Sequence, residues 1–291
     1  MTSAALRKAE PIVEGEFHFT WDDFAAIASL LLEQTGISLP ESKATLVYSR
    51  LAKRLRRLGL TSFLQYRQLL NSPAGADEGL ALVSALTTNV TRFFREPHHF
   101  DHLRQTVLPA LLESAKAGGR VRLWSAACST GEEAYSIALT VLELCPNANT
   151  YDIRILATDI DPDVLKVGRA GQYRHASLEA VPDKLRQRWF EPCGEKPEWA
   201  SIKQDVKALV SFRQLNLNGS WPFQGAFDAI FCRNVVIYFD EPTQAQLWQR
   251  LRDRLTSGGR LYVGHSERVD VPGFRPEGHT VYRLDGQAGG A

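Results

Sequence analysis

The sequence lacks the features that mark membrane, secreted and strongly charged proteins. It has 291 residues and a formal net charge of +1, so the whole molecule has no strong attraction to nucleic acid or to anionic membranes. No uninterrupted apolar run is long enough to span a bilayer, and the first residues lack the hydrophobic core of a signal peptide. The four cysteines are scattered without a Cys-x-x-Cys pair, which favours reduced thiols. We therefore expect a cytoplasmic protein without membrane insertion.

Motifs of several common enzyme classes are also missing. There is no G-x-G-x-x-G loop for a dinucleotide and no Lys-Ser/Thr ending of a phosphate-binding loop. No Ser-His-Asp or Cys-His arrangement is evident, and no cluster of histidine, cysteine and aspartate has metal-ligand spacing. His98 and His99, which follow Pro97, fit structural or capping roles better than metal binding. The sequence therefore predicts no metal site and disfavours dinucleotide chemistry.

Hydrophobic periodicity predicts a helical region near the N-terminus. Residues 1–16 are polar and aperiodic and are expected to form a disordered tail. From there to residue 90 (17–90) apolar residues recur at helical spacing, beginning with Thr20 as an N-cap, so this region is expected to be all-helical. At the other end of the chain, the composition of residues 286–291 predicts a flexible tail.

The region 91–285 alternates short apolar runs with helical patterns. This alternation predicts an α/β fold with a doubly wound, mostly parallel sheet. The stretch 172–213 contains several proline and glycine residues and interrupts the alternation, so we interpret it as a small inserted β-subdomain. Its β-prone segments lie near Trp199–Lys203 and Ala208–Phe212. The last predicted strand, Thr280–Leu284, is expected at an antiparallel edge of the sheet.

A loop of small residues follows the first predicted strand, Val121–Ala127. Small side chains let the backbone approach a flat ligand closely, and Gly131 tolerates unusual dihedral angles. A helix then begins at Glu132, which leaves its first amides unpaired at the carboxyl edge of a parallel sheet. Two adjacent acids, Glu132 and Glu133, would repel phosphates and suit a cationic ligand, although they also complement a helix dipole.

Two further acids, Asp159 and Asp161, end the second predicted strand. An acid at this position can accept hydrogen bonds from both ribose hydroxyls of a nucleoside. Asp161 precedes Pro162 and suits a helix N-cap, so we assign the ribose to Asp159. Ribose recognition without a phosphate cradle indicates an adenosine that carries no phosphate, and the whole pattern favours S-adenosyl-L-methionine.

The motifs, taken in order and spacing, resemble the chemotaxis receptor glutamate O-methyltransferase family of the CheR type. The resemblance covers nearly the whole chain. The matching segments are Thr87–Glu96 (TTNVTRFFRE), Trp124–Ser136 (WSAACSTGEEAYS), Ala157–Asp161 (ATDID), Phe227–Phe239 (FDAIFCRNVVIYF) and Gly264–Glu267 (GHSE).

This resemblance implies a fold, a reaction and a set of site residues. The fold is a class I S-adenosylmethionine methyltransferase domain with a helical N-terminal domain and a small β-subdomain. The reaction methylates glutamate side chains of bacterial chemoreceptors and leaves S-adenosyl-L-homocysteine. Some relatives also bind a receptor peptide through the β-subdomain. The cofactor ligands implied are Asn89, Thr91, Arg95, Glu133, Asp159, Asn216, Leu217, Cys232, Arg233 and Asn234.

Arg95 and Tyr238 are the residues that the resemblance places at the reacting end. A glutamate carboxylate is ionised at neutral pH and can attack the sulfonium methyl directly, so no general base is needed. Arg95 could hold the incoming carboxylate or clamp the carboxylate of the cofactor. Tyr238 could form a hydrogen bond near the methyl group or with the substrate, or it could pack at a strand end. These alternatives stay open at the level of the sequence.

One predicted helix face carries four cations. Arg50, Lys53, Arg54 and Arg57 are spaced i, i+3, i+4 and i+7, so they share a face that suits the glutamate-rich helices of chemoreceptors. A solvated basic face is the simpler alternative. An RNA methyltransferase that uses this helix, and an inactive adaptor that binds cofactor and docks on receptors, are the competing functions. We favour methyl transfer to receptors by a monomer that binds no nucleic acid.

Overall fold

The computed structural model describes residues 11–87, 89–194 and 196–286. They form two compact units, which are described separately. The helical unit contains the described residues up to Thr87 together with Tyr238–Asp240, and the sheet unit contains Asn89–Ile237 and the chain from Glu241 onward. Residues 1–10 and 287–291, which belong to the two expected tails, lie outside the described residues. No helix in the described part of the chain is long and apolar enough to cross a membrane.

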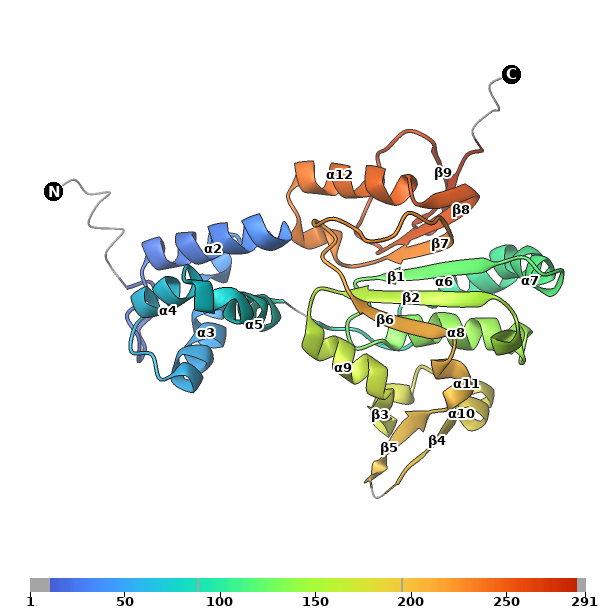
Figure 1. Ribbon diagram of the computed structural model, residues 1–291, viewed down its shortest axis with the longest axis horizontal. Helices are drawn as coiled ribbons and strands as arrows, with labels where there is room; N and C mark the ends of the chain where they lie inside the picture. Colours follow the sequence, from blue (N-terminus) through green and yellow to red (C-terminus); the bar gives the residue numbers. More distant parts are fainter. Residues whose placement is uncertain (1–10, 88, 195, 287–291) are drawn as a thin grey trace. The chain divides into compact units, whose positions relative to one another are not determined.

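Four helices account for most of the described helical unit. They are α2 (Trp21–Thr35), α3 (Ala44–Leu58), α4 (Phe63–Leu70) and α5 (Ala76–Leu86), with short 3₁₀ turns at Glu41–Lys43 and Pro73–Gly75 (Figure 1). Helix α2 begins at the expected cap, where the Thr20 hydroxyl accepts a hydrogen bond from the Asp23 amide and the Asp23 carboxylate accepts one from the Thr20 amide. Helix α3 ends at Gly59, whose φ of 68° is left-handed and favours glycine.

The start of the described chain packs on the helical unit. The amide of Ile12 donates to the carbonyl oxygen of Phe19 at 2.8 Å, and Glu16 pairs with Arg56 at 2.7 Å. Phe19 is fully buried in an aromatic cluster, with its ring centroid 4.4 Å from that of Phe63. The expected disorder therefore does not hold for residues 11–16, because backbone pairing and the burial of Phe19 hold this stretch in place.

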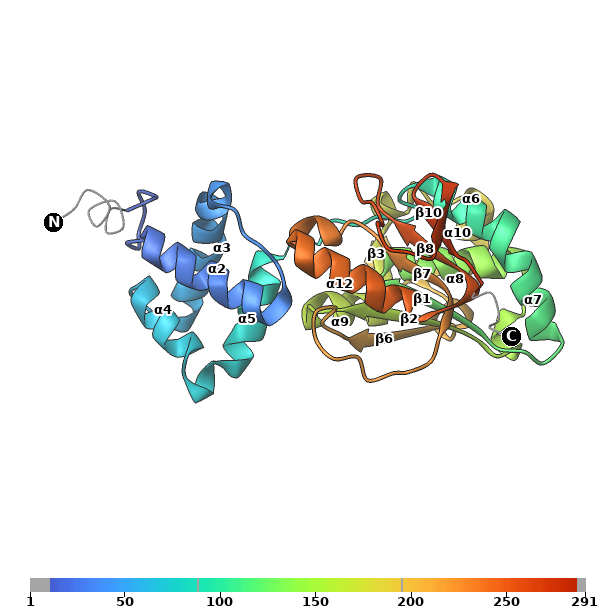
Figure 2. The same cartoon turned by 90° about the horizontal axis from the view of Figure 1, so that it is seen from above.

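The sheet unit is built on a seven-stranded sheet with the order β6-β2-β1-β7-β8-β10-β9 (Figure 1; β10 is labelled in Figure 2). Its strands are β1 (Val121–Ala126), β2 (Ile153–Asp159), β6 (Val210–Gln214), β7 (Phe227–Cys232), β8 (Leu255–Val263), β9 (Phe274–Gly278) and β10 (Val281–Leu284). The first five strands in spatial order are parallel, which confirms the doubly wound, mostly parallel sheet. Strand β10 is antiparallel as expected, but it pairs with both β8 and β9, so the edge strand is β9.

The sheet unit also contains helices that precede β1 or connect later strands. They are α6 (Pro97–His102), α7 (Leu108–Lys116), α8 (Glu132–Leu144), α9 (Pro162–Ala170), α10 (Asp183–Trp189), α11 (Gln204–Lys207) and α12 (Glu241–Arg252), with a π-helical turn at Leu103–Val107. Helices α7 and α8 contact β1, α9 contacts β2 and β6, and α12 contacts β8 (Figure 2). This arrangement buries β1 and β7 in the centre and brings the carboxyl ends of the parallel strands to one edge.

A second, three-stranded sheet forms the inserted region. It has the order β3-β5-β4, with β3 (Gln172–Arg174), β4 (Phe190–Cys193) and β5 (Lys196–Ile202), and its pairs are antiparallel. The segment Ala208–Phe212 was expected in this region, but Val210–Gln214 forms β6 and pairs in parallel with β2. The physical reason is the burial of Phe212, whose ring packs against the backbone at Gly131 and so ties β6 to the main sheet.

Candidate cofactor site

The loop between β1 and α8 turns sharply at the carboxyl edge of the sheet. Ala127 and Ser129 have φ values of 64° and 50°, and Gly131 has a φ of 97°. A Cβ atom at Gly131 would lie 3.0 Å from the ring of Phe212 and 3.1 Å from the Cα of Gly168. Glycine is therefore favoured here for two reasons, the left-handed backbone and the lack of space for a side chain. The loop therefore has the tight backbone that its small residues predict.

Asp159 is buried at the end of β2 and accepts two backbone hydrogen bonds. The amide of Ser129 donates to its Oδ2 at 2.8 Å and the amide of Asp161 to its Oδ1 at 3.0 Å. Burial raises the pKa of Asp159. Asp161 accepts from the Asp163 amide as an N-cap of α9, and the side-chain amide of Asn89 donates to its other oxygen at 2.9 Å. The cap predicted for Asp161 is confirmed, and the ribose role of Asp159 stays a prediction.

The segment Asn89–Glu96 lies against the cofactor loop. The Ser129 hydroxyl donates to the carbonyl oxygen of Asn89 at 2.9 Å, and the amide of Phe94 donates to the Ser136 hydroxyl at 2.9 Å. The Arg95 guanidinium donates to the carbonyl oxygen of Val90 at 3.0 Å. Asn89, Thr91 and Arg95, three of the predicted ligands, are therefore carried on one segment that is fastened to the loop, and all three are half-buried.

Glu133 and Arg233 form a buried charge network at this edge. Glu133 accepts from the Ser125 hydroxyl at 2.7 Å and from Arg233 at 3.0 Å. Arg233 also lies 3.2 Å from Glu96 and donates to the carbonyl oxygen of Arg95. Burial raises the pKa of Glu133, whereas Arg233 and His265 outweigh burial and lower the pKa of Glu96 to about 2. The network joins α8, the loop after β7 and the Asn89–Glu96 segment.

Cys232 and Asn234 lie at the end of β7, next to the cofactor loop. Cys232 pairs in register with Ala126 of β1 and Val263 of β8, and it is fully buried. Burial raises the pKa of the Cys232 thiol, which keeps it protonated and unreactive. Asn234 has a φ of 58°, a left-handed conformation at the turn that leads out of the strand. Both predicted ligands are thus placed at the same sheet edge as Asp159.

Arg250 holds the loop that follows β6. Its guanidinium donates to the carbonyl oxygen of Leu217 at 2.7 Å and also to that of Gly219. It lies 4.0 Å from the ring centroid of Trp221, which is a cation–π contact. Asn216, the other predicted ligand of this loop, accepts a hydrogen bond from the Asn218 amide at 2.9 Å. No sequence pattern indicates this role of Arg250, because the carbonyl oxygens it contacts lie 33 and 31 positions away along the chain.

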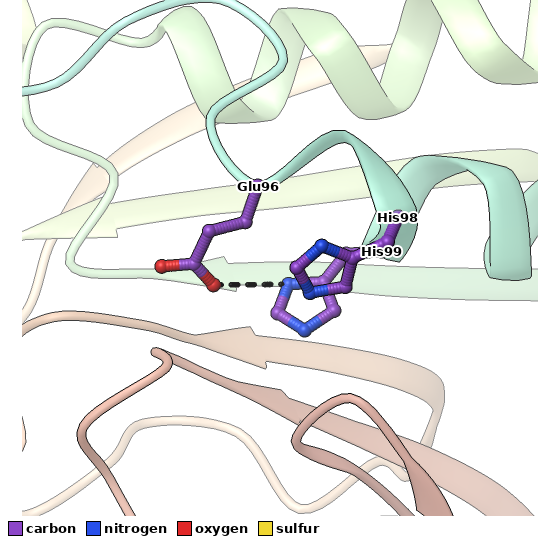
Figure 3. Close-up of side chains that lie close together, drawn as sticks. All are labelled: Glu96, His98 and His99. Atoms are coloured by element: carbon purple, nitrogen blue, oxygen red, sulfur yellow. Dashed lines mark ion pairs between the residues drawn. The ribbon is translucent and has the colours of Figure 1, made fainter.

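Three ligand-type side chains gather at the start of α6, namely Glu96, His98 and His99, with ligand atoms within 4.8 Å of one another (Figure 3). The Nε2 of His99 contacts the carbonyl oxygen of His279 at 2.8 Å, and its Nδ1 faces Glu96 Oε2 at 3.5 Å. The guanidinium of Arg233 lies 3.2 Å from the same oxygen, so a metal ion would be bound beside a fixed positive charge. Burial, then Arg233, lowers the pKa of His99 to about 3, which favours a neutral packed ring. We assign no metal to this cluster.

The four cations predicted for partner recognition divide into two pairs. Arg54 makes a two-pronged contact with buried Glu78, at 2.7 Å for its Nε, and Arg50 donates to the carbonyl oxygens of residues 85–87 at the end of α5. Lys53 and Arg57 are exposed. The shared helix face is therefore present, but two of its four cations make contacts inside the helical unit.

Tyr238 belongs to the helical unit. Its carbonyl oxygen accepts a hydrogen bond from the amide of Ser38 at 2.8 Å, and the next residue, Phe239, forms an antiparallel bridge with Ile37. The side chain is half-buried. Its expected place at the reacting end stays a prediction.

Two family models match the chain. One is described as "CheR methyltransferase, SAM binding domain" and matches residues 89–279, and the other as "CheR methyltransferase, all-alpha domain" and matches residues 22–87. The chain belongs to the CheR methyltransferase family. It is a methyltransferase that uses S-adenosyl-L-methionine, and it acts in chemotaxis.

Curated relatives match over nearly their full length. A "Probable chemotaxis protein methyltransferase" of Rhizobium etli is 54% identical, covering 87% of this chain and 96% of the relative. A "Chemotaxis protein methyltransferase" of Escherichia coli is 40% identical, covering 97% and 96%. Among solved structures, the glycopeptide N-methyltransferase MtfA complexed with sinefungin has a distant likeness, with 15% identity and a TM-score of 0.30 over 53% of this chain and 47% of that chain.

The donor set at the sheet edge fits the cofactor. Buried acids and a glycine-dependent close approach of the loop suit an uncharged ribose and a cationic sulfonium and ammonium, whereas phosphates would be repelled. The residues that would hold it are the predicted ligands on the Asn89–Glu96 segment, the loop before α8, and the ends of β2 and β7.

Proposed function

We propose that this enzyme methylates glutamate side chains on the cytoplasmic helices of chemoreceptors and thereby forms glutamate methyl esters. The observation that carries the proposal is the buried acid Asp159 at the carboxyl edge of the sheet, next to a segment that carries Arg95. Family membership supports the same reaction, and the relatives from Rhizobium etli and Escherichia coli are named as chemotaxis protein methyltransferases.

The chemistry asks for alignment and needs no base. S-adenosyl-L-methionine supplies a methyl group on a positively charged sulfur, and a substrate carboxylate is already ionised at neutral pH. The protein has to hold that carboxylate in line, since position alone can contribute much of the rate. Arg95 is half-buried and uses one nitrogen for the Val90 carbonyl oxygen, so its remaining N–H groups can donate to a carboxylate.

Recognition of the receptor is assigned to the exposed cations of α3. Lys53 and Arg57 offer positive charge to solvent, and acidic helices are the chemical class of partner that such a face attracts. Arg50 and Arg54 contribute to the local potential, but their donors are engaged within the helical unit. We expect the receptor to be bound mainly through Lys53 and Arg57.

Transfer of a labelled methyl group to membranes containing candidate receptors tests the proposal. We expect base-labile label on receptor glutamates, located by peptide mapping, and no label on RNA offered in parallel. Lys53→Glu should raise the KM for the receptor, most strongly at low salt, with kcat nearly unchanged. Lys116→Glu, which makes the same charge change on exposed α7, is the matched control. Label on RNA alone would overturn the proposal.

A further inference from the structure

Glu267 is a buried carboxylate that accepts four backbone hydrogen bonds. Its Oε1 accepts from the amides of Val235 and Val236 at 3.0 Å and 2.9 Å, and its Oε2 accepts from the amides of Asn234 and Gly264 at 2.9 Å and 2.6 Å. The residue is 4% exposed. Three of the four donors are consecutive amides of one turn, so the carboxylate holds that turn as a bound anion would.

The turn in question is the Arg233–Val236 loop, which leaves the end of β7. Strand β7 lies between β1 and β8, and Cys232 is level with Ala126, from which the cofactor loop departs. Arg233, the first residue of the loop, reaches Glu133 and Glu96 with its side chain. Any displacement of the loop would therefore move a guanidinium that joins the first turn of α8 to the Asn89–Glu96 segment, which carries Arg95.

Gly264 completes the contact between the two segments. A Cβ atom there would lie 2.4 Å from the side-chain nitrogen of Asn234 and 2.8 Å from Glu267 Oε2. The absence of a side chain at Gly264 thus lets Asn234 and Glu267 pack against the backbone at the end of β8. Asn234 itself has a left-handed φ of 58°, a conformation that needs support from its surroundings.

We propose that Glu267 is a positioning residue for methyl transfer: it fixes the Arg233–Val236 loop so that the groups at the reacting end are held in line. This inference rests on the proposed function for its kinetic readout. Glu267 is too buried to contact a substrate, so it acts through the backbone amides that donate hydrogen bonds to its carboxylate. Because the reaction depends on alignment, loosening this loop should affect the chemical step more than cofactor binding.

Glu267→Gln is the first test, made in the full-length protein. A glutamine keeps the size of the side chain but has one acceptor oxygen, so two of the four amides lose their partner. We expect faster hydrogen exchange in the peptide that covers 233–237 and a kcat for receptor methylation reduced roughly 100-fold. The Kd for S-adenosyl-L-homocysteine, measured by calorimetry, should stay within about threefold of the original value.

Gly264→Ala provides a second variant if the first does not fold, because it disturbs the same contact without a change of charge. Ser266→Ala, an exposed neighbour in the same turn, is the control and should leave all three readouts unchanged. Unchanged hydrogen exchange, or faster exchange with an unchanged kcat, would overturn the inference. So would an equal loss of kcat and of S-adenosyl-L-homocysteine affinity, which would make Glu267 a support of cofactor binding.

Failure of the proposed function looks different from these outcomes. If the unaltered enzyme transfers no methyl group to any receptor glutamate, the proposed function is overturned. The hydrogen-exchange measurement would then still decide whether Glu267 holds the loop, since it needs neither receptor nor methyl transfer.

Discussion

Arg54 on the basic face of α3 could either recognise a partner or stabilise the helical unit, and its ion pair with Glu78 favours the second role. The spacing of the cations predicts that Arg54 recognises a partner, whereas the structure gives it a buried partner of its own. Its Nε lies 2.7 Å from Glu78 Oε1, and the Tyr66 hydroxyl donates to the same oxygen at 2.8 Å. The two charged side chains are 14% and 7% exposed. We predict that Arg54→Ala destabilises the helical unit.

The loss of stability expected for Arg54→Ala depends on the Glu78 carboxylate, which stays buried after its partner is removed. Removing one partner of a buried pair costs about 3–5 kcal/mol, because the remaining charge is buried without compensation. Tyr66 continues to donate to Glu78, and Arg54 is partly open to solvent, so we expect the lower end, about 3 kcal/mol. This corresponds to a roughly 100-fold rise in the open population of the unit, at 1.4 kcal/mol for each factor of ten.

Hydrogen exchange of peptides from α3 to α5 in the full-length protein measures this change. Lys53→Ala, on the same helix but exposed, is the matched control and should leave exchange unchanged. Equal protection in the two variants would refute the structural role. If the Arg54→Ala variant kept normal protection from hydrogen exchange but had a raised KM for the receptor, Arg54 would instead contact the partner.

The same pair predicts a pH dependence. Burial alone would raise the pKa of Glu78, but hydrogen bonds from Arg54 and Tyr66 outweigh it and lower that pKa. A carboxyl whose pKa is lower in the folded state stabilises fully above its unfolded value, near about 4.3, and loses this contribution as the pH falls through the folded value. Arg54→Ala should weaken this acid-sensitive part of the stability, which acid titration of helix protection would detect.

Three further predictions concern the sheet unit. Asp159→Ala should weaken binding of S-adenosyl-L-homocysteine at least about tenfold in calorimetry. Burial raises the pKa of Asp159, so this carboxylate becomes protonated at a higher pH than an exposed aspartate. The affinity of the unaltered enzyme for S-adenosyl-L-homocysteine should therefore begin to fall at that higher pH on acidification. Arg250→Ala should free the Leu217 and Gly219 carbonyl oxygens and weaken the same binding severalfold, with kcat at saturating cofactor retained. Brief alkylation followed by mass spectrometry should modify half-buried Cys193 and spare the three buried cysteines; early labelling of a buried one would contradict the packing.

Much of the fold could be predicted because the decisive signals are local. The runs that became β1, β2 and β7 are mostly apolar and mostly buried, as expected for strands covered on both faces. Strand β6 was misplaced because its neighbour β2 is distant in sequence, and because its segment is mostly polar, with Phe212 buried and Val210 only partly buried. Pairing between distant segments is information that a single-sequence pattern does not carry.

The site residues likewise fall into those whose roles depend on neighbours in the chain, which could be predicted, and those whose roles depend on distant contacts, which could not. Asp161 could be recognised as a cap and Asp159 as the acid of the strand end from position alone, since both roles depend on neighbours in the chain. Glu267 lies in a segment that resembled the family, yet its role was missed because its three loop donors are more than thirty residues away. The internal use of Arg54 was missed for a similar reason, as Glu78 lies on another helix.

The chemistry explains why these distant contacts matter. An enzyme that needs no general base has no single side chain whose loss removes the reaction, so its rate depends on how well several loops are held together. In this protein Arg233 joins α8 to the Asn89–Glu96 segment, and Glu267 holds the loop that carries Arg233. Variants at such supports should therefore lower kcat as much as variants at residues that touch substrate. That expectation distinguishes a site governed by alignment from one governed by proton transfer, where supports matter less than the base itself.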